Sequence, residues 1–421
     1  LELSTDLSAV LSAPRSAGNV RQRKRNARQV LEKKTELGMD IPSAKTDPGA
    51  TVQTEFPALP LGYGEQGLLF ENISLKELVR QYGTPLYVYS APYMLAALRS
   101  YQAALGTDGE VFFAVKACSN IWILDQLRKA GAGVDIVSLG ELRRAQAAGF
   151  SGSRIVFSGV GKTVQEMEAA LQAGLRFLVI ESLAELKLLE EVARRMGLVA
   201  RISVRVNPDI AASTHPYIAT GLGSHKFGVP MQDVLPLYRL AQDSPHLEAV
   251  AIGFHIGSQI MSPGAHYAAM ERILDLTRKL RETLGLSLNH LDLGGGLGIA
   301  YDEGLSPHPQ EFIESLRPLL PEGMQWIVEP GRSISGNAGI LITEVLYRKN
   351  NGSKDFIICD AAMNDLLRPA LYQAEHRILP IMNTEASIEA DLVGPVCESG
   401  DFLARDRLLP DVDSGDLLAI L

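Results

Sequence analysis

The chain has 421 residues, of which 46% are hydrophobic and 21% charged, a balance typical of a folded globular protein with more than one domain. Its net charge of −9 argues against a nucleic-acid partner, because such partners select a basic surface. No apolar run reaches the roughly 18 residues that span a bilayer, so we expect no membrane partner. The three cysteines are too few for a disulfide framework, which favours the reducing cytoplasm.

The N-terminal residues differ in composition from the rest of the chain. Residues 18–34 are basic and carry few apolar side chains, so we expect 1–55 to be a disordered or non-native extension. A transit peptide is the alternative, and it would direct the protein to the plastid stroma. Residues 56–84 follow a linker rich in Pro, Gly and Thr, and we expect them to pack on a C-terminal β domain.

Between residues 85 and 332, short apolar runs alternate with helical patterns. Runs that are apolar at nearly every position are what strands buried on both faces require. Eight such units in about 250 residues predict the α/β class and a closed, TIM-like (β/α)8 barrel, with a doubly wound open sheet as the competing fold. The strands are expected at 111–117, 133–138, 154–159, 176–182, 201–208, 251–258, 290–296 and 326–332.

Hydroxyl residues followed three positions later by glutamate mark the start of two expected helices. Thr163 with Glu166, and Ser182 with Glu185, fit capping boxes, in which the hydroxyl and the carboxylate each accept a backbone N–H. These signals support helices after the third and fourth expected strands.

After residue 332 the pattern changes to short strand-like runs without long helices between them. The runs lie at 343–350, 355–362, 386–395 and 416–421. They predict an antiparallel β-sandwich or β-barrel domain over 333–421. The sequence stops inside the last apolar run, so we expect this domain to be incomplete.

Polar residues and glycines stand at the ends of all eight expected barrel strands. In a (β/α)8 barrel the active site lies where the strands end, so these groups are expected to face one another. The loops after the seventh and eighth strands usually bind phosphate, and here they carry a glycine run and an arginine. The residues are Lys116, Asp135, Ser138, Ser158, Glu181, Arg205, Asn207, His255, Ser258, Gly294, Gly295, Gly296, Glu329, Pro330, Gly331 and Arg332.

A lysine and a phosphate site at one barrel end suggest pyridoxal 5'-phosphate as the cofactor. Its aldehyde needs an amine, which Lys116 would supply, and its ring nitrogen needs an acidic partner, for which Glu329 is placed. An isolated lysine at a strand end is more often a solvated residue, but the buried VFFAV run before Lys116 argues for the barrel mouth. His255 would stack on the cofactor ring, although a satisfied core histidine is the commoner role. No CxxC or HExxH spacing occurs, so we expect no metal site.

Several segments resemble the fold-type III, or alanine-racemase-like, family of pyridoxal-phosphate decarboxylases. The resemblance runs from about residue 68 to the end of the sequence. Within the family, RPALY together with CESGD favours the diaminopimelate decarboxylase branch over the ornithine and arginine branches. The matching segments are FAVKACSN, VDIVSLGE, RVNP, HPYIATG with SHKFG, GFHIGSQI, LDLGGGLGI, EPGRSI, MNDLLRPALY and GPVCESGDFL.

The resemblance implies cofactor contacts at matching positions. Lys116 would form the Schiff base with the cofactor, and His255 would stack on its ring. Ser258, Gly296 and the stretch from Glu329 to Arg332 would also bind the cofactor.

The resemblance further implies substrate contacts and a partner chain. Arg332, Arg368 and Tyr372 would hold the distal end of a small amino-acid substrate, and Glu398 suits its ammonium group. Cys397 would be the proton donor. Cys397 and Glu398 would both reach into the site of a neighbouring subunit, which implies a homodimer with shared active sites.

The implied reaction is decarboxylation of meso-2,6-diaminopimelate to L-lysine and CO2, the last step of lysine biosynthesis. Another diamino acid (ornithine, arginine or carboxynorspermidine) is the alternative substrate. A non-catalytic regulatory homologue is an alternative of another class, but it would be expected to lose Lys116 or Cys397. An amino-acid racemase would need a second base, normally a tyrosine of the β domain, and no convincing candidate is found. The family also carries a tyrosine, in an Ala-Tyr-Gly-like segment beyond Leu421, so the resemblance leads us to expect an incomplete site.

Overall fold

The computed structural model describes residues 61–210, 226–301 and 306–421. The expected extension over 1–55, with its transit-peptide alternative, lies outside the described residues, as does the HPYIATG segment at 215–221. Within the described ranges the chain forms three sheets, of three, nine and seven strands. The nine-stranded sheet contains the barrel that positions the candidate site.

Eight parallel strands close into a barrel. They are β5 (Gly109–Ala114), β6 (Gly133–Ile136), β7 (Ile155–Phe157), β8 (Phe177–Ile180), β9 (Ala200–Asn207), β11 (Leu247–Gly253), β12 (His290–Asp292) and β13 (Gln325–Val328). They follow one another around the ring in sequence order, and β13 pairs with β5 to close it. The two-residue β10 (Val229–Pro230) adds to β9. The predicted closed barrel is confirmed, and the competing open sheet is wrong.

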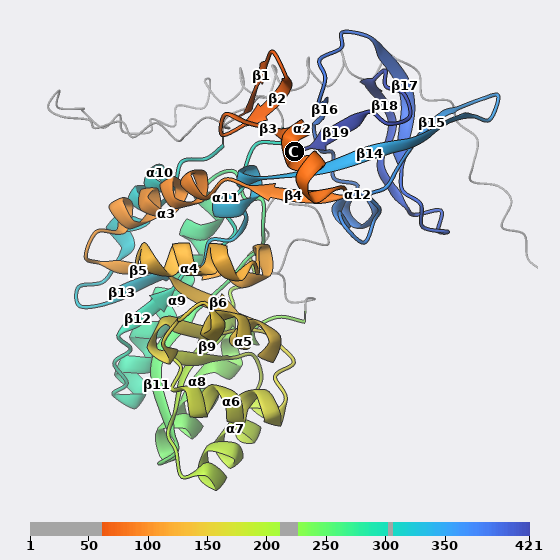
Figure 1. Ribbon diagram of the computed structural model, residues 1–421. Coiled ribbons are helices and arrows are strands. Elements are labelled where there is room, and N and C mark those ends of the chain that lie inside the picture. The colour runs from red at the N-terminus through yellow and green to blue at the C-terminus, as the bar shows by residue number, and fades with distance from the viewer. Residues whose placement is uncertain (1–60, 211–225, 302–305) are drawn as a thin grey trace, which may run out of the picture. The chain divides into compact units, whose positions relative to one another are not determined.

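Helices lie outside these strands and form the outer layer of the barrel (Figure 1). Their inward faces pack with the strands into one large buried core. The α-helices are α3 (Ala91–Leu105), α4 (Ile121–Lys129), α5 (Leu139–Ala147), α6 (Val164–Ala173), α7 (Leu183–Met196), α8 (Met231–Asp243), α9 (Gly264–Leu284), α10 (Pro309–Leu316) and α11 (Arg332–Ser335). Single 3-10 turns are η1 (Val115–Ala117), η2 (Gly152–Arg154), η3 (Arg317–Leu319) and η4 (Gly336–Ala338).

The barrel interior is filled with side chains. Phe112, Phe177, Val250 and Ile327 belong to a buried cluster separate from the outer core. Such a filled interior is usual for (β/α)8 barrels and leaves the carboxyl ends of the strands, the barrel mouth, for chemistry.

The two predicted capping boxes have different outcomes. At α6, Thr163 and Glu166 form both bonds of the box, as predicted. At α7, Ser182 accepts the N–H of Glu185, but the Glu185 carboxylate bonds to the N–H of Glu181 and to Lys162. The second box is therefore only half formed, because a buried lysine and another backbone N–H take the glutamate.

The C-terminal part of the chain forms a seven-stranded, mostly antiparallel sheet. Its strands are β14 (Gly339–Asn350), β15 (Asp355–Cys359), β16 (Ile378–Pro380), β17 (Ser387–Val393), β18 (Phe402–Pro410), β19 (Leu417–Ile420) and β4 (Leu86–Tyr89), and the short helix α12 (Arg368–Tyr372) precedes β16. The order is β16-β19-β14-β15-β17-β18, and β4 also pairs with β14. The predicted β domain is confirmed, although β15 and β17 run parallel to each other.

Residues before the barrel pack against this second sheet. A small sheet of β1 (Leu61–Gly64), β2 (Gly67–Phe70) and β3 (Ile73–Ser74) precedes α2 (Leu75–Tyr82). Leu68 and Phe70 share a buried cluster with Ile340 and Ala419. Since β4 lies after residue 85 yet pairs with β14, the division of the chain at residues 85 and 332 stays a prediction.

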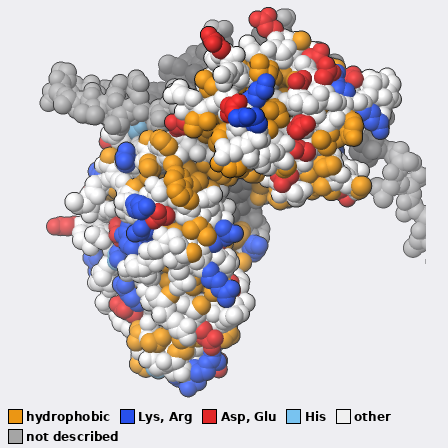
Figure 2. Space-filling model, in the orientation of Figure 1, with side chains coloured by type: hydrophobic (Ala, Val, Ile, Leu, Met, Phe, Trp, Pro, Cys, Tyr) orange, Lys and Arg blue, Asp and Glu red, His pale blue; other side chains and the backbone are white. Residues whose placement is uncertain are grey.

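The visible surface carries both signs of charge. Figure 2 shows acidic and basic side chains interspersed, without one large basic patch on the face drawn. In the described ranges no helix is long and apolar enough to cross a membrane. The expectation that the protein binds neither nucleic acid nor membrane stays a prediction.

Candidate active site

Lys116 lies on a 3-10 turn that continues β5 at the barrel mouth. The strand expected to run to residue 117 ends at Ala114, and η1 follows it. The Lys116 side chain is 55% exposed, whereas the neighbouring Asp135 side chain is 1% exposed. The Lys116 Nζ and Asp135 Oδ2 atoms are 4.0 Å apart. The lysine is therefore an accessible amine beside a buried carboxylate.

Asp135 brings this carboxyl group from β6. Both of its oxygens are shielded from solvent. Burial raises the pKa of Asp135, and the positive charge of Lys116 and the nearby Ser158 hydroxyl act against that shift. The lysine therefore favours an ionised Asp135, as an opposite charge does in a poorly solvated site.

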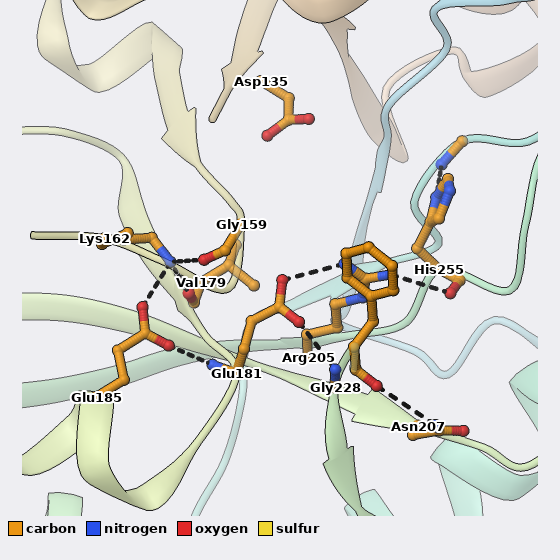
Figure 3. A network of polar contacts seen from close by, with 12 residues as sticks. Asp135, Gly159, Lys162, Val179, Glu181, Glu185, Arg205, Asn207, Gly228 and His255 are labelled. Carbon is orange, nitrogen blue, oxygen red and sulfur yellow. Dashed lines mark hydrogen bonds and ion pairs between the residues drawn. The ribbon is translucent and has the colours of Figure 1, made fainter. Parts of the chain in front are cut away.

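Arg205 joins three barrel strands through its guanidinium (Figure 3). Nη1 donates to Glu181 Oε1 at 3.0 Å, and Nη2 donates to the His255 carbonyl at 3.3 Å. The other Glu181 oxygen accepts the N–H of Gly228 at 2.8 Å. Figure 3 shows Asp135 pointing toward this network without joining it. Glu181, which the sequence indicated only as a polar strand end, thus neutralises Arg205.

Lys162 is a buried cation of the same region that the sequence analysis missed. It follows β7, its side chain is 1% exposed, and Nζ lies 2.7 Å from Glu185 Oε1. Nζ also donates to two backbone carbonyls, and Glu185 accepts the N–H of Glu181 (Figure 3). The pair therefore fixes the end of β8 next to Arg205. A lysine after a strand was the available signal, but a solvated lysine gives the same pattern.

His255 follows β11 and is held as a neutral imidazole. Burial lowers its pKa well below the ordinary value, and the charges of Arg205 and Lys116 lower it further. Its Nδ1 accepts the N–H of Gly295 at 3.1 Å, which places the ring hydrogen on Nε2. A neutral ring of this kind can lie against a planar ligand without adding charge to the site.

The glycine run after β12 forms a fixed loop between two histidines. Gly294 and Gly296 have φ values of +64° and +113°, a backbone region that side chains disfavour. His255 accepts from the N–H of Gly295, and His266 Nε2 donates to its carbonyl at 3.1 Å. Burial lowers the pKa of His266 to about 4, so this histidine is neutral as well. The sequence analysis predicted the glycines and missed His266.

Asp292 ends β12, and Glu329 follows the neighbouring strand β13. Asp292 is 4% exposed and accepts the N–H of Gly294 at 2.8 Å. Glu329 Oε1 is shielded from solvent and has no partner among the described residues. Burial raises the pKa of both carboxyl groups, that of Asp292 to about 7. Asp292 was not predicted, although it stands two residues before the glycine run.

The guanidinium groups of Arg332 and Arg368 both contact the ring of Tyr301. Arg332 donates to the Tyr301 hydroxyl and, at 3.3 Å, to Ser258 Oγ. The Arg368 guanidinium carbon lies 5.3 Å from the ring centroid of Tyr301 and 5.6 Å from that of Tyr372. Arg368 Nε is buried without a hydrogen-bond partner, and among the described residues neither arginine forms an ion pair with a carboxylate. The cluster can therefore accept a ligand carboxylate, and Tyr301 is a member that the sequence did not reveal.

Cys397 and Glu398 lie on a turn between β17 and β18. Both residues are exposed, Cys397 is a free thiol, and Glu398 Oε1 accepts the N–H of Gly400 at 3.4 Å. Among the described residues, no hydrogen bond or ion pair links either one to Lys116. The polar contacts of the described chain therefore do not link these two predicted site residues to Lys116.

Comparison with known proteins identifies the family. A family model described as "Pyridoxal-dependent decarboxylase, pyridoxal binding domain" matches residues 93–336. The diaminopimelate decarboxylase of Aquifex aeolicus is 46% identical over 364 residues, which are 86% of this chain and 86% of the relative. The chain belongs to the diaminopimelate decarboxylase family. The enzyme of Vibrio cholerae is 45% identical over 85% of this chain and 87% of its own length. The crystal structure of Helicobacter pylori diaminopimelate decarboxylase complexed with L-lysine aligns with a TM-score of 0.78 at 42% identity, covering 82% of this chain and 87% of that chain.

The residues of this chain fit pyridoxal phosphate, the cofactor of this decarboxylase family. Lys116 offers an accessible amine, and Glu329 Oε1 is a buried acceptor without a partner. The fixed glycine loop, Ser258 and Arg332 supply donors suited to a phosphate. No group of three or more His, Cys, Asp or Glu side chains in the described ranges could hold a metal ion.

Proposed function

We propose that this protein decarboxylates meso-2,6-diaminopimelate to L-lysine and CO2, the last step of lysine biosynthesis. The main support is Lys116, which is an accessible amine beside the buried Asp135 at the barrel mouth. The chain is also 46% identical to the diaminopimelate decarboxylase of Aquifex aeolicus. The Helicobacter pylori relative is complexed with L-lysine in its crystal structure, which is the product of the proposed reaction.

Lys116 would hold the cofactor covalently. When bound, pyridoxal phosphate supplies an electron-withdrawing ring that stabilises the charge left as CO2 departs. Asp135 would orient the lysine, and Arg205 would contribute positive charge on the cofactor side of the mouth. The N–H groups of residues 294–296, together with Ser258 and the 329–332 stretch, would bind the phosphate end.

His255 and Glu329 would set the charge around the cofactor ring. His255 is neutral and would stack on the ring, as the resemblance implies. Glu329 would face the ring nitrogen, and its raised pKa makes it a strong base for a proton at that position. A neutral His255 and a basic Glu329 would together keep a proton on the ring nitrogen of the cofactor.

Arg332, Arg368 and Tyr372 would bind the distal amino-acid end of the substrate. The two arginines lack acidic partners of their own in the described chain, and a guanidinium can bind a carboxylate through two parallel hydrogen bonds. Tyr301, which contacts both arginines, would hold them in place.

We further propose a homodimer with shared active sites. Cys397 and Glu398 are exposed on their turn, so each chain would place them in the site of the other. Cys397 would then deliver the proton to the α-carbon after CO2 leaves, and Glu398 would bind the distal ammonium group. A cytoplasmic location and the domain division at 56–84, 85–332 and 333–421 remain part of the proposal.

The function is tested by turnover of a substrate panel. Purified protein with pyridoxal phosphate is given meso-diaminopimelate, ornithine, arginine or carboxynorspermidine, and CO2 release is measured together with the amine product. We expect lysine and CO2 from meso-diaminopimelate, with kcat/KM at least roughly a hundredfold above the others, because their distal ends lack the zwitterion that the arginines recognise. A preference for ornithine, arginine or carboxynorspermidine would overturn the proposed substrate.

A further inference from the structure

Gln259 lies on the loop after β11 and has a backbone conformation that is unusual for its residue type. Its φ is +61°, in the left-handed region that residues with a side chain rarely adopt. Such a conformation costs free energy, and it persists only where the surrounding structure holds it, often at functional sites. Gln259 also stands directly after Ser258, which accepts a hydrogen bond from Arg332. The contacts of its side chain therefore show what holds this loop beside the arginine.

The Gln259 side-chain amide binds the backbone of one residue on the loop after β12. Nε2 donates to the Ile299 carbonyl at 2.5 Å, and Oε1 accepts the Ile299 N–H at 3.2 Å. Next to this pair, the Ile260 N–H donates to the Gly296 carbonyl at 2.9 Å, and the Gly298 N–H donates to the Ile260 carbonyl at 3.0 Å. Four hydrogen bonds thus join the two loops, and the Gln259 amide supplies two of them.

The residue that Gln259 binds stands two positions before Tyr301. The Tyr301 hydroxyl accepts a hydrogen bond from Arg332, and Arg332 Nε donates to Ser258 Oγ at 3.3 Å. The loops after β11, β12 and β13 are therefore linked into a closed ring by the chain and by hydrogen bonds. The members of the ring are Ser258, Gln259, Ile299, Tyr301 and Arg332.

We propose that Gln259 is a positioning residue that fixes Tyr301, and through it Arg332 and Arg368, in the arrangement that binds the distal carboxylate of the substrate. Both guanidinium groups lie over the Tyr301 ring, so a shift of its loop would move the two arginines relative to each other. A guanidinium binds a carboxylate through two parallel hydrogen bonds only when the groups are correctly oriented. This inference rests on the proposed function of the arginines, but its first test needs neither cofactor nor substrate.

The first test is a double-mutant cycle in the stability of the cofactor-free protein. Gln259→Met keeps the length of the side chain but loses both bonds to Ile299, and Tyr301→Phe loses the hydroxyl that bonds to Arg332. Urea denaturation gives the free energy of unfolding of the two single variants and of the double variant. We expect the double variant to lose less than the sum of the single losses, because the tyrosine is correctly placed only while Gln259 holds its loop. Losses that simply add would contradict the coupling.

The second test measures the distal-end site of the holoenzyme. L-lysine keeps the amino-acid end of meso-diaminopimelate that is not decarboxylated, so its dissociation constant, measured by calorimetry, reports this site without turnover. We expect Gln259→Met to raise that constant and the KM for meso-diaminopimelate roughly tenfold, as when one hydrogen bond to a charged group is weakened. The kcat should change by less than about twofold, because the distal contacts are the same before and during the reaction. A lysine dissociation constant equal to that of the wild type would overturn the inference.

Two further variants separate the amide from other effects. Gln259→Gly loses the same two bonds but adopts the φ of +61° without strain, so it should weaken lysine binding as Gln259→Met does. An effect in the methionine variant alone would point to backbone strain and contradict the role of the amide. The matched control is Gln102→Met on α3, where an equally half-buried glutamine donates to the Ala130 carbonyl at 2.8 Å. It should leave the lysine dissociation constant unchanged.

The outcomes distinguish this inference from the proposed function. Should Gln259→Met fail to fold, Gln259→Gly replaces it in both tests. If the wild type neither binds L-lysine nor turns over meso-diaminopimelate, the proposed function fails, and the urea cycle alone decides whether Gln259 positions Tyr301.

Discussion

At the scale of single residues, the region of the barrel mouth contains a buried ion pair in which each charge is stabilised by the other. Lys162 and Glu185 are both nearly inaccessible to solvent, with side-chain exposures of 1% and 8%. Removing two charges from water is costly, and their attraction offsets that cost only while both are present. Loss of one partner should therefore be more damaging than loss of both.

This expectation gives a prediction for Lys162. Lys162→Met leaves the Glu185 carboxylate buried without a cation and should destabilise the protein by about 3–5 kcal/mol. Combining it with Glu185→Gln removes both charges and keeps an oxygen that can accept the Glu181 N–H, so most of the loss should be recovered. Urea denaturation midpoints provide the measurement, with exposed Lys279→Met as the control. A single Lys162 variant as stable as that control would refute the buried-pair account.

The sequence predicted the candidate site residues that stand at strand ends. It did not predict those whose burial depends on the packing of other strands. Lys116, Asp135 and His255 could be predicted because barrel strands direct their last residues into the mouth. Tyr301 and Lys162 could not, since the sequence does not say which polar side chains other strands will enclose. Asp292 is intermediate: its place before the glycine run was visible, but the strand that pairs beside it was not.

At the scale of elements, local patterns predicted which segments become strands and helices but not all of their bonds. Each of the eight barrel strands overlaps an expected run, although the run at 251–258 shares only residues 251–253 with β11. The half-formed capping box at α7 arises because Lys162 and the Glu181 N–H, brought there by two other strands, occupy Glu185. The β4–β14 and β15–β17 pairs likewise join segments distant in sequence, and strand composition does not specify such partners.

At the scale of the whole molecule, no hydrogen bond or ion pair of the described residues links two predicted site members, Cys397 and Glu398, to Lys116. Lys116, His255 and the arginines come from the barrel mouth and α12, whereas Cys397 and Glu398 stand exposed on a turn of the second sheet. A twofold dimer can supply that turn to each site from the other chain. The same arrangement would give every dimer two sites, each built from both chains.

The shared-site proposal predicts recovery of activity on mixing two inactive variants. Lys116→Ala and Cys397→Ala should each be inactive or nearly so alone. After dissociation and random reassociation in equal amounts, about a quarter of wild-type activity should return, because half the dimers are mixed and each mixed dimer has one intact site. Lys116→Ala mixed with His255→Ala is the control, since both lesions belong to the barrel half of a site and no intact site can form. Mixed dimers of the first pair that remain inactive would show that the sites are not shared.

The most direct measurement of the central claim maps the lysine that holds the cofactor. Holoenzyme is reduced with borohydride, digested and analysed by peptide mass spectrometry, with Lys116→Ala in parallel. The geometry of an accessible amine beside buried Asp135 predicts the pyridoxyl phosphate mass on the peptide that contains Lys116, and its loss in the variant. The same mass on another lysine, such as Lys162, with Lys116 unmodified in the wild type, would contradict the account.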